Sequence, residues 1–229
     1  MMKLAFRLLL ILLPLGGMAQ TPQDSLRVLW VGNSFSYCND LPGMVQKIAS
    51  TQKVKLSCTR FLKGGERFSG HLKNKKLLQA IADGGWDYVV LQEQSAAPAM
   101  PTGQVAREVY PAARTLDSLV HAASPDARVI FYMTWGHKYG NRKPVAEYPL
   151  SNGYEGMQER LKTSYLEMAY DNGAWCAPLG MAWRAVRSER PDCILYRPDC
   201  YHPAVPGSYL AANVIFTTIL QRPYQTAFT

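Results

Sequence analysis

The sequence is poor in several features that mark specialised classes of protein. Only 18% of its 229 residues are charged, and it has only four histidines and five cysteines. It contains no internal repeat, no low-complexity tract and, beyond residue 20, no apolar run long enough to cross a bilayer. With 48% hydrophobic and 11% aromatic residues, it is not a disordered tail, a collagen-like chain or a small disulfide scaffold. The composition instead describes one globular domain with a substantial core.

Residues 1–19 have the pattern of a secretory signal peptide. Lys3 and Arg7 form a positive start, and Leu8 to Leu15 form an apolar run that is too short for a membrane-spanning helix. Gly17-Met18-Ala19 then supplies the small residues of a cleavage site, and no cysteine follows the run to carry a lipid anchor. We therefore expect an exported protein, periplasmic or secreted, with no stable membrane insertion.

The expected mature domain, residues 20–229, gives little support to metal or nucleic-acid binding. Its five cysteines match no zinc-ligand spacing, and their odd number leaves at least one thiol without a partner within the chain. Cys193 and Cys200 are either bridged in an oxidising compartment or free. The net charge of +8 falls to +6 once the two basic residues of the signal peptide are removed. The remaining basic residues are dispersed, so we expect no nucleic-acid partner.

Strand-like and helix-like patterns alternate along the mature chain. The strands are predicted at 27–31, 54–59, 86–92, 127–134 and 174–177, and the helices at 40–52, 71–82, 104–123, 154–171 and 204–220. This order predicts an α/β fold: a three-layer α/β/α sandwich around a mostly parallel, flavodoxin-like, five-stranded sheet. Ligands of such sheets bind beyond the carboxyl ends of the strands, so residues that directly follow a strand are the candidates for function.

Ser34 directly follows the first predicted strand, within Gly32-Asn33-Ser34-Phe35-Ser36. Gly32 permits a tight turn, from which the serine hydroxyl can project into the crevice beyond the sheet. The same serine could instead cap a helix, a role for which Ser36 and Asn39 are also suited. Ser34 alone is therefore a weak signal of catalysis.

Asp199 and His202 stand just before the last predicted helix, in Asp199-Cys200-Tyr201-His202-Pro203. A serine hydroxyl becomes a good nucleophile only when a base takes its proton, and that base must be held in one tautomer. At this spacing the carboxylate can orient the imidazole, although the pattern alone also suits a polar turn. Together with Ser34 at the other end of the domain, it indicates nucleophilic catalysis.

The two segments resemble the first and last sequence motifs of the SGNH (GDSL-like) hydrolases. Gly32-Asn33-Ser34-Phe35-Ser36 looks like the first motif with Asn where many members have Asp, and Asp199 and His202 match the last motif at its spacing. The resemblance covers essentially the whole mature chain. It implies that Ser34 is the nucleophile, His202 the general base and Asp199 its orienting carboxylate, with no metal and no organic cofactor.

The resemblance also implies an oxyanion hole, and here the sequence departs from the family. The N–H of Ser34 and a glycine N–H after the second strand are two of the donors, and Gly65 is favoured over the adjacent Gly64. The third donor is normally the Asn of a Gly-x-Asn-Asp motif, which this sequence lacks. A glutamine amide can donate the same bond, so we predict Gln92 in this role, with Gln94 as the alternative.

Five other residues have side chains suited to binding or catalysis. Trp135 and His137 follow the fourth predicted strand and are candidate substrate-binding residues, whereas His71 and His121 are predicted as surface or helix-capping residues. Glu93 has no convincing acidic partner at another strand end, which disfavours a paired-carboxylate glycosidase.

The long loop at 135–152 is rich in basic and aromatic residues. Such a loop suits a sugar polymer that carries carboxylates, although charged loops are usually just solvated; the residues concerned are Lys138, Tyr139, Arg142, Lys143 and Tyr148. Together with the resemblance, the residues predict a serine esterase, and export favours O-acetyl groups on a carbohydrate. The alternatives are a lipase or thioesterase of the same fold, or a non-catalytic glycan-binding module with a degenerate site. The expected partner is a small-molecule or polysaccharide ester.

Overall fold

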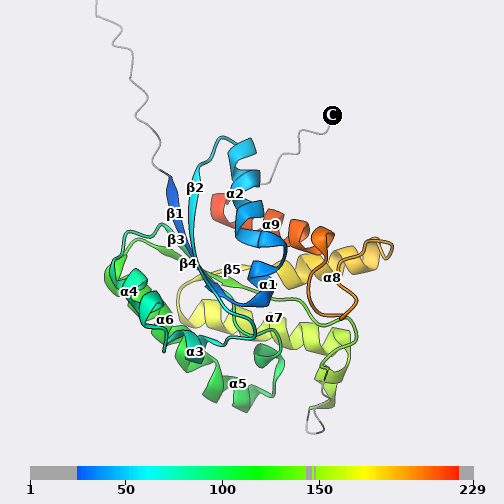
Figure 1. Ribbon diagram of the computed structural model, residues 1–229. Coiled ribbons are helices and arrows are strands. Elements are labelled where there is room, and N and C mark those ends of the chain that lie inside the picture. Colours follow the sequence, from blue (N-terminus) through cyan, green and yellow to red (C-terminus); the bar gives the residue numbers. More distant parts are fainter. Residues whose placement is uncertain (1–24, 143–145, 147, 222–229) are drawn as a thin grey trace, which may run out of the picture.

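Five strands form one sheet in the order β2-β1-β3-β4-β5, with every neighbouring pair parallel (Figure 1). This computed structural model describes residues 25–142, 146 and 148–221, so the predicted signal peptide lies outside the described residues. The strands are β1 (Leu26–Gly32), β2 (Leu56–Leu62), β3 (Tyr88–Leu91), β4 (Arg128–Tyr132) and β5 (Trp175–Ala177). The predicted five-stranded parallel sheet is confirmed.

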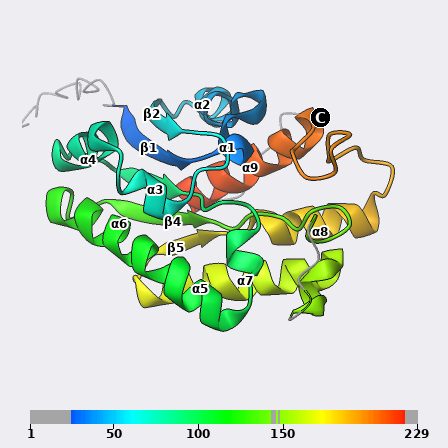
Figure 2. The ribbon, with the colours of Figure 1, turned by 60° about the horizontal axis from the view of Figure 1, so that its bottom comes forward.

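Helices cover both faces of this sheet, as Figure 2 shows. They are α1 (Ser34–Tyr37), α2 (Leu41–Thr51), α3 (Phe68–His71), α4 (Lys75–Ala82), α5 (Thr102–Glu108), α6 (Tyr110–Ala123), α7 (Tyr154–Asp171), α8 (Leu179–Glu189) and α9 (Val205–Leu220), with 3₁₀ turns η1 (Cys38–Asp40), η2 (Ala97–Ala99) and η3 (Pro149–Asn152). Among the described residues, no helix is long and apolar enough to span a membrane.

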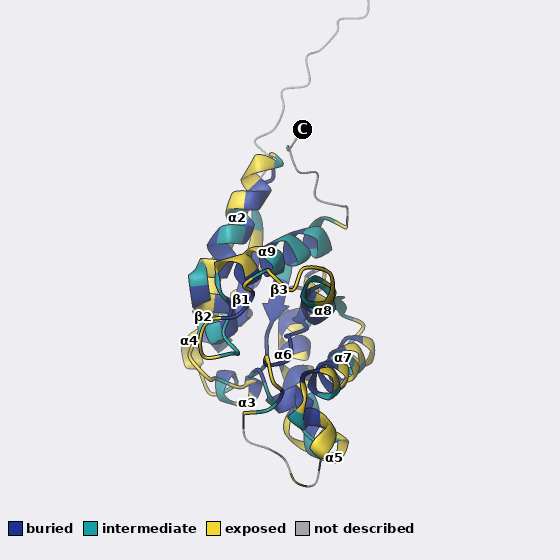
Figure 3. Cartoon of the chain, turned by 90° about the vertical axis from the view of Figure 1, so that its right-hand side faces the viewer, coloured by how far each residue is buried: buried dark blue, intermediate teal, exposed yellow. Residues whose placement is uncertain are grey.

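Alternate strand residues build two separate cores, because successive side chains of a strand point to opposite faces. On β1, Val28 and Trp30 pack with residues of α2, α8 and α9, whereas Leu29 and Val31 pack with residues of α4, α5, α6 and α7. The central strands β1, β3 and β4 therefore lie buried between two layers of helices whose outer faces are exposed (Figure 3). This burial on both faces explains the continuous apolar runs of the sequence.

Two of the predicted helices are each divided in the structure. The helix predicted at 71–82 is interrupted because Asn74 caps α4, its side chain accepting from the N–H groups of Lys76 and Leu77. The helix predicted at 104–123 breaks between α5 and α6, where Pro111 stands in the first turn of α6 and has no N–H to donate. Asn74 as a helix cap and Pro111 as a first-turn residue are sequence signals of these two breaks, which the predicted ranges did not take into account.

Helix α8 was not predicted from the sequence. It packs closely against the end of the sheet at Gly180, where a Cβ atom would lie 2.3 Å from the carbonyl oxygen of Thr134. It also buries Trp183 completely, in the core shared with α9. Because glycine is a poor helix former, the packing rather than the local sequence stabilises this helix.

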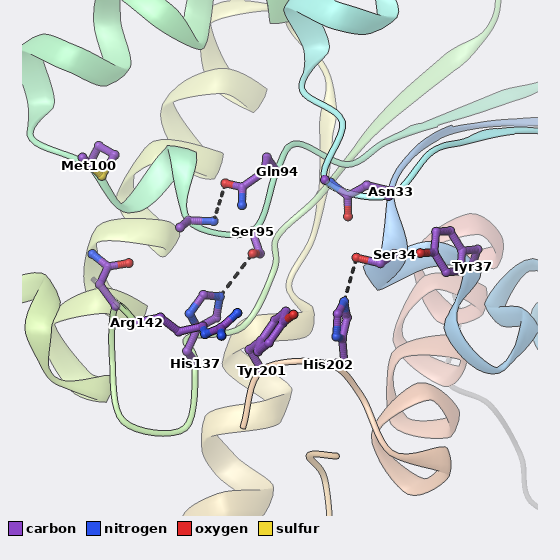
Figure 4. A pocket seen from close by; sticks show the side chains of 14 residues that line it. Asn33, Ser34, Tyr37, Gln94, Ser95, Met100, His137, Arg142, Tyr201 and His202 are labelled. Carbon is purple, nitrogen blue, oxygen red and sulfur yellow. Dashed lines mark hydrogen bonds between the residues drawn. The ribbon is translucent and has the colours of Figure 1, made fainter. Parts of the chain in front are cut away.

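The strand order places a topological switch between β1 and β3, whose following loops lie side by side. Parallel strands end at the same edge of the sheet, and an open α/β sheet binds its ligands at such a switch. The loops after β1, β2, β3 and β4 meet there, together with the segment that precedes α9 (Figure 4).

Candidate active site

Ser34 is the first residue of α1 and directly follows the turn at the end of β1. Asn33 caps this short helix, its side-chain oxygen accepting from the N–H of Phe35 at 3.2 Å. The Asn33 amide nitrogen donates to the carbonyl of Glu66 at 3.0 Å, which ties the serine turn to the loop after β2. No described group accepts from the N–H of Ser34, as expected for the first turn of a helix.

His202 and Ser34 lie 168 positions apart in the sequence and are joined by a hydrogen bond. The distance from Nε2 of His202 to Oγ of Ser34 is 2.8 Å, and Nδ1 of His202 lies 2.8 Å from Oδ2 of Asp199 (Figure 4). The other oxygen of Asp199 accepts from the backbone N–H groups of Tyr201 and His202. Cys200 has the positive φ of 67° that lets this turn close. The three predicted triad residues are therefore brought together in one chain of hydrogen bonds.

The charge of Asp199 fixes how the imidazole of His202 is used. Burial by itself raises the pKa of Asp199, but the hydrogen bonds from His202 and from two backbone N–H groups outweigh it and lower the pKa overall. An ionised carboxylate accepts only, so Nδ1 of His202 carries the proton and Nε2 presents its lone pair to the Ser34 hydroxyl. This arrangement can take the proton of the serine as the hydroxyl attacks.

Aromatic rings support the histidine from behind. Trp135 is fully buried, stacks between Phe35 (4.6 Å between centroids) and Trp183 (3.9 Å), and donates its indole N–H to the carbonyl of Tyr201 at 3.0 Å. The ring of Tyr201 packs in turn against His202 in a tilted arrangement, with centroids 4.1 Å apart. The prediction that Trp135 binds substrate is therefore wrong. With none of its surface accessible, this residue carries the loop that holds His202.

A cavity of about 870 Å³ opens beside Ser34 and His202 (Figure 4). Its walls come from the segments after β1, β2, β3 and β4 and from the segment before α9, and they include Asn33, Ser34, Tyr37, Gly64, Gly65, Gln94, Ser95, Ala96, Met100, His137, Asn141, Arg142, Tyr201 and His202. Both glycines predicted as oxyanion donors line it, and no described group accepts from the N–H of either. Gly65 has a φ of +67°, a conformation that costs little only in glycine.

Gln92 does not reach this cavity, which corrects the prediction that its amide is the third oxyanion donor. The side chain is fully buried, and its oxygen accepts from the N–H of Asn33 at 2.9 Å and the hydroxyl of Ser36 at 3.0 Å. Its nitrogen donates to the Asn33 side chain and to the carbonyl of Glu93. A Cβ atom on Gly32 would lie 2.8 Å from Oε1 of Gln92, so this close approach requires glycine at the end of β1.

Gln94, the predicted alternative, lines the cavity. Its oxygen accepts from the N–H groups of Ala96 and Ala97, both at 2.9 Å, which fixes the orientation of the amide. No described group accepts from its nitrogen, and Figure 4 shows the nitrogen on the cavity side of the amide. Of the two glutamines, only Gln94 is placed to donate to a bound oxyanion.

His137 lies in the opposite wall of the cavity, and only 5% of its surface is exposed. Its Nε2 is 3.1 Å from the hydroxyl of Ser95, and its Nδ1 has no partner among the described residues. Burial, together with the nearby charge of Arg142, lowers the pKa of His137 to about 4. The ring is therefore neutral at pH 7. A contact with substrate remains a prediction for this residue.

Glu93 lies beneath the cavity. No part in the site was predicted for this residue from the sequence. It is 1% exposed, and its carboxyl group accepts from the backbone N–H of Gln94 at 2.6 Å and of Phe68 at 3.2 Å. It thereby joins the loop that carries Gln94 to the loop that carries the two glycines. Burial raises the pKa of Glu93 to about 7, against the effect of these hydrogen bonds. Its position indicates that Glu93 holds these two loops together beneath the cavity.

Replacing Glu93 by glutamine is expected to change how stability depends on pH. Because the fold raises the pKa of Glu93 from 4.5 to about 7, its contribution to stability is complete below the unfolded value and is lost as the pH rises through the folded one. The loss amounts to about 3 kcal/mol over this interval. Glutamine does not titrate, yet its oxygen can accept the same two bonds.

The measurement is the free energy of unfolding in urea at several values between about pH 4 and about pH 8. The wild-type protein should lose stability relative to Glu93→Gln as the pH rises. Glu189→Gln, at the exposed end of α8, removes a carboxyl group elsewhere and should follow the wild-type curve. Parallel curves for wild type and Glu93→Gln would contradict the prediction.

The remaining histidines and the cysteines are also placed by the structure. His71 is buried rather than on the surface, which corrects that prediction: its Nε2 donates to the carbonyl of Gly32 at 2.9 Å and so anchors the turn before Ser34. His121 is half-exposed on α6, beside Asp117. All five cysteines are free thiols, so the Cys193–Cys200 bridge is not formed. Within the described ranges, no three metal-ligating side chains gather to hold an ion.

Solved structures share this fold. A protein from Slackia heliotrinireducens described as an SGNH hydrolase is 30% identical, with a TM-score of 0.71 over 86% of this chain and 100% of its own. A DUF4886 family protein from Bacteroides uniformis is 18% identical, with a TM-score of 0.71 over 90% and 88% of the two chains. Axe2, an acetylxylan esterase from Geobacillus stearothermophilus, is 12% identical, with a TM-score of 0.62 over 84% and 93%. No family model and no curated relative matches the sequence.

The fold and the hydrogen-bonded serine, histidine and aspartate together define an α/β/α protein with a serine-type site. The chain belongs to the SGNH hydrolases. The resemblance noted in the two terminal sequence motifs is thereby confirmed.

Proposed function

We propose that the protein is a serine esterase that removes O-acetyl groups from a carbohydrate through an acyl-enzyme. The observation that carries this proposal is the chain of two 2.8 Å hydrogen bonds from Asp199 through His202 to Ser34, at the wall of an open cavity. A binding module with a degenerate site would not need a serine hydroxyl aligned with a base in this way. The alignment therefore favours an enzyme.

The proposed reaction begins with attack of Ser34 Oγ on the carbonyl carbon of the ester. His202 Nε2 takes the hydroxyl proton, and Asp199 stabilises the imidazolium ion that results. The carbonyl oxygen becomes an oxyanion, for which the N–H groups of Ser34 and Gly65 and the amide of Gln94 are the proposed donors. His202 then gives its proton to the departing alcohol as the carbon–oxygen bond breaks. Water attacks the acyl-enzyme by the same route in reverse and releases the acid and the free serine.

Carbohydrate as the alcohol part is supported by the walls of the cavity. Tyr37 and Tyr201 present aromatic surface, and side-chain amides and hydroxyls provide hydrogen-bonding groups around them. A lipase would instead need a broad groove of aliphatic side chains beside the nucleophile, and Ala96 and Met100 are the aliphatic side chains among the described lining residues. The fold that the chain shares with an acetylxylan esterase supports the same substrate class.

The proposal includes export, which the pattern at residues 1–19 supports. An acetylated polysaccharide is met outside the cytoplasm, where an exported enzyme can reach it. N-terminal sequencing of the mature protein should begin at Gln20. A protein that keeps Met1 would contradict export by cleavage.

The experiment compares acetyl and octanoyl esters of the same alcohol, with Ser34→Ala as the blank for each. We expect the acetyl ester to be hydrolysed with the higher kcat/KM, because only Ala96 and Met100 among the described lining residues offer aliphatic side chains to a long acyl chain. A panel of acetylated glycans, assayed for released acetate, then identifies the sugar. A preference for the octanoyl ester would favour the lipase alternative, and no hydrolysis of any ester would favour a binding module.

A further inference from the structure

One permanent positive charge lines the cavity, and no acidic side chain lies among the described lining residues. The charge belongs to Arg142, on the loop after β4. Two described carboxyl groups near the cavity are turned away from it: Asp199 lies behind His202, and Glu93 lies beneath the floor. The permanent charge that a ligand meets on the described wall is therefore positive.

Arg142 is not neutralised by the described part of the protein. Other arginines of the chain have carboxylate partners, such as Arg60 with Asp40 and Arg67 with Glu108. Arg142 has no acidic side chain within ion-pair distance among the described residues, and its guanidinium lies over the ring of Tyr201, 4.7 Å from the centroid. Stacking of this kind holds the planar group in one place while its N–H donors stay free for a ligand.

The stacking also sets where Arg142 lies relative to the reacting atoms. Tyr201 carries Arg142 on one side and packs against His202 on the other, with ring centroids 4.1 Å apart. In Figure 4, Arg142, Tyr201 and His202 follow one another toward Ser34. The positive charge is therefore one aromatic ring away from the histidine that bonds to Ser34.

We propose that Arg142 makes this cavity selective for esters whose alcohol part carries a carboxylate near the acylated hydroxyl, such as an O-acetylated hexuronic acid. The inference rests on the proposed esterase function and names its substrate class. The planar guanidinium matches a carboxylate with two parallel hydrogen bonds, and Tyr201 provides the face on which the sugar ring packs. A neutral sugar would leave the guanidinium without a partner.

The experiment uses two substrates that differ only in this charge. They are the methyl glycoside of an O-acetylated hexuronic acid and that of the corresponding O-acetylated hexose. The wild-type enzyme should favour the charged substrate by roughly three- to tenfold in kcat/KM, because the guanidinium is exposed and partly screened. The preference should lie in KM and should fall as salt is added.

Arg142→Gln should bring the two substrates to nearly equal kcat/KM, by raising KM for the charged one alone. Arg142→Lys should keep part of the preference, since it keeps the charge but loses the planar fork. The matched control is Lys138→Gln. Lys138 lies on the same loop and its Nζ sits over the ring of Tyr139, yet it does not line the cavity. This control should keep the full preference.

Binding to Ser34→Ala makes the test independent of turnover. Calorimetric titration of this variant with the two acetylated glycosides reports the charge preference even if the proposed chemistry fails. Equal binding or hydrolysis of the two substrates by proteins that retain Arg142 would overturn the inference. An equal loss of preference in Arg142→Gln and Lys138→Gln would also overturn it, since it would assign the effect to net charge. Retained hydrolysis in Ser34→Ala would instead overturn Ser34 as the nucleophile, and the binding of the two glycosides would still decide the charge preference.

Discussion

Replacing Ser34 by alanine is expected to lower the rate of ester hydrolysis by about 10⁴- to 10⁶-fold. The variant has no hydroxyl to attack the carbonyl, so the covalent route is closed. His202 and the oxyanion donors can then act only on water, which leaves a small residual rate. The fold should not change, because Ser34 is half-buried and its hydroxyl bonds only to His202 among the described residues.

Acetate release and the midpoint of thermal unfolding should be measured on the same preparations. Ser57→Ala, which removes an exposed hydroxyl from β2 far from the cavity lining, is the control and should behave as wild type in both. A serine-directed phosphonate should label the wild-type protein on Ser34 and leave Ser34→Ala unlabelled. Hydrolysis that survives in the alanine variant at more than a trace would show that another group is the nucleophile.

The second large effect is expected at Gln94, where Gln94→Glu should lower kcat by at least about 10²- to 10³-fold. The change keeps the oxygen that accepts from Ala96 and Ala97 and removes the nitrogen that faces the cavity. It also brings a negative charge to the place where the oxyanion forms. The midpoint of thermal unfolding should stay near that of the wild type, since the local hydrogen bonds remain.

The matched comparison for Gln94→Glu is Gln92→Glu, the same substitution two residues earlier in the sequence. Gln92→Glu buries a carboxylate against the side-chain oxygen of Asn33 and the carbonyl of Glu93, to which the amide nitrogen now donates. Its main effect should be on stability, with a loss of at least about 1–3 kcal/mol for the unsatisfied buried groups. Urea unfolding and single-turnover hydrolysis on both variants check this. A stable but inactive Gln92→Glu, with an active Gln94→Glu, would restore the original prediction for Gln92.

The sequence alone could not decide which of these two glutamines faces the cavity. Residues two apart in an extended chain point to the same side, so the sequence places Gln92 and Gln94 alike. In the structure the N–H of Gln92 still bonds to the carbonyl of Val31 on β1, and its side chain fills the space over Gly32. The chain turns only after that point, which moves Gln94 into the cavity. The turn depends on contacts with β1, which no local pattern encodes.

The predictions for Trp135 and His71 were wrong for a related reason. Both lie at the ends of elements near the cavity, where the sequence suggested exposure. The structure covers Trp135 with Phe35 and Trp183, which come from opposite parts of the chain. It covers His71 by docking α3 on the end of β1. Burial of this kind follows from long-range packing rather than from the residue or its neighbours.

The layered fold could be predicted from the sequence alone, since apolar runs and helical periodicity record which residues must leave water. The residue types that a serine-type site needs could also be recognised at the two chain ends, because a nucleophile, a base and an orienting carboxylate have few chemical substitutes. Which amide and which charge face the ligand followed instead from the packing of distant segments. Side-chain direction after a strand is set by the partners that distant segments bring, and here those partners meet only when the sheet is assembled.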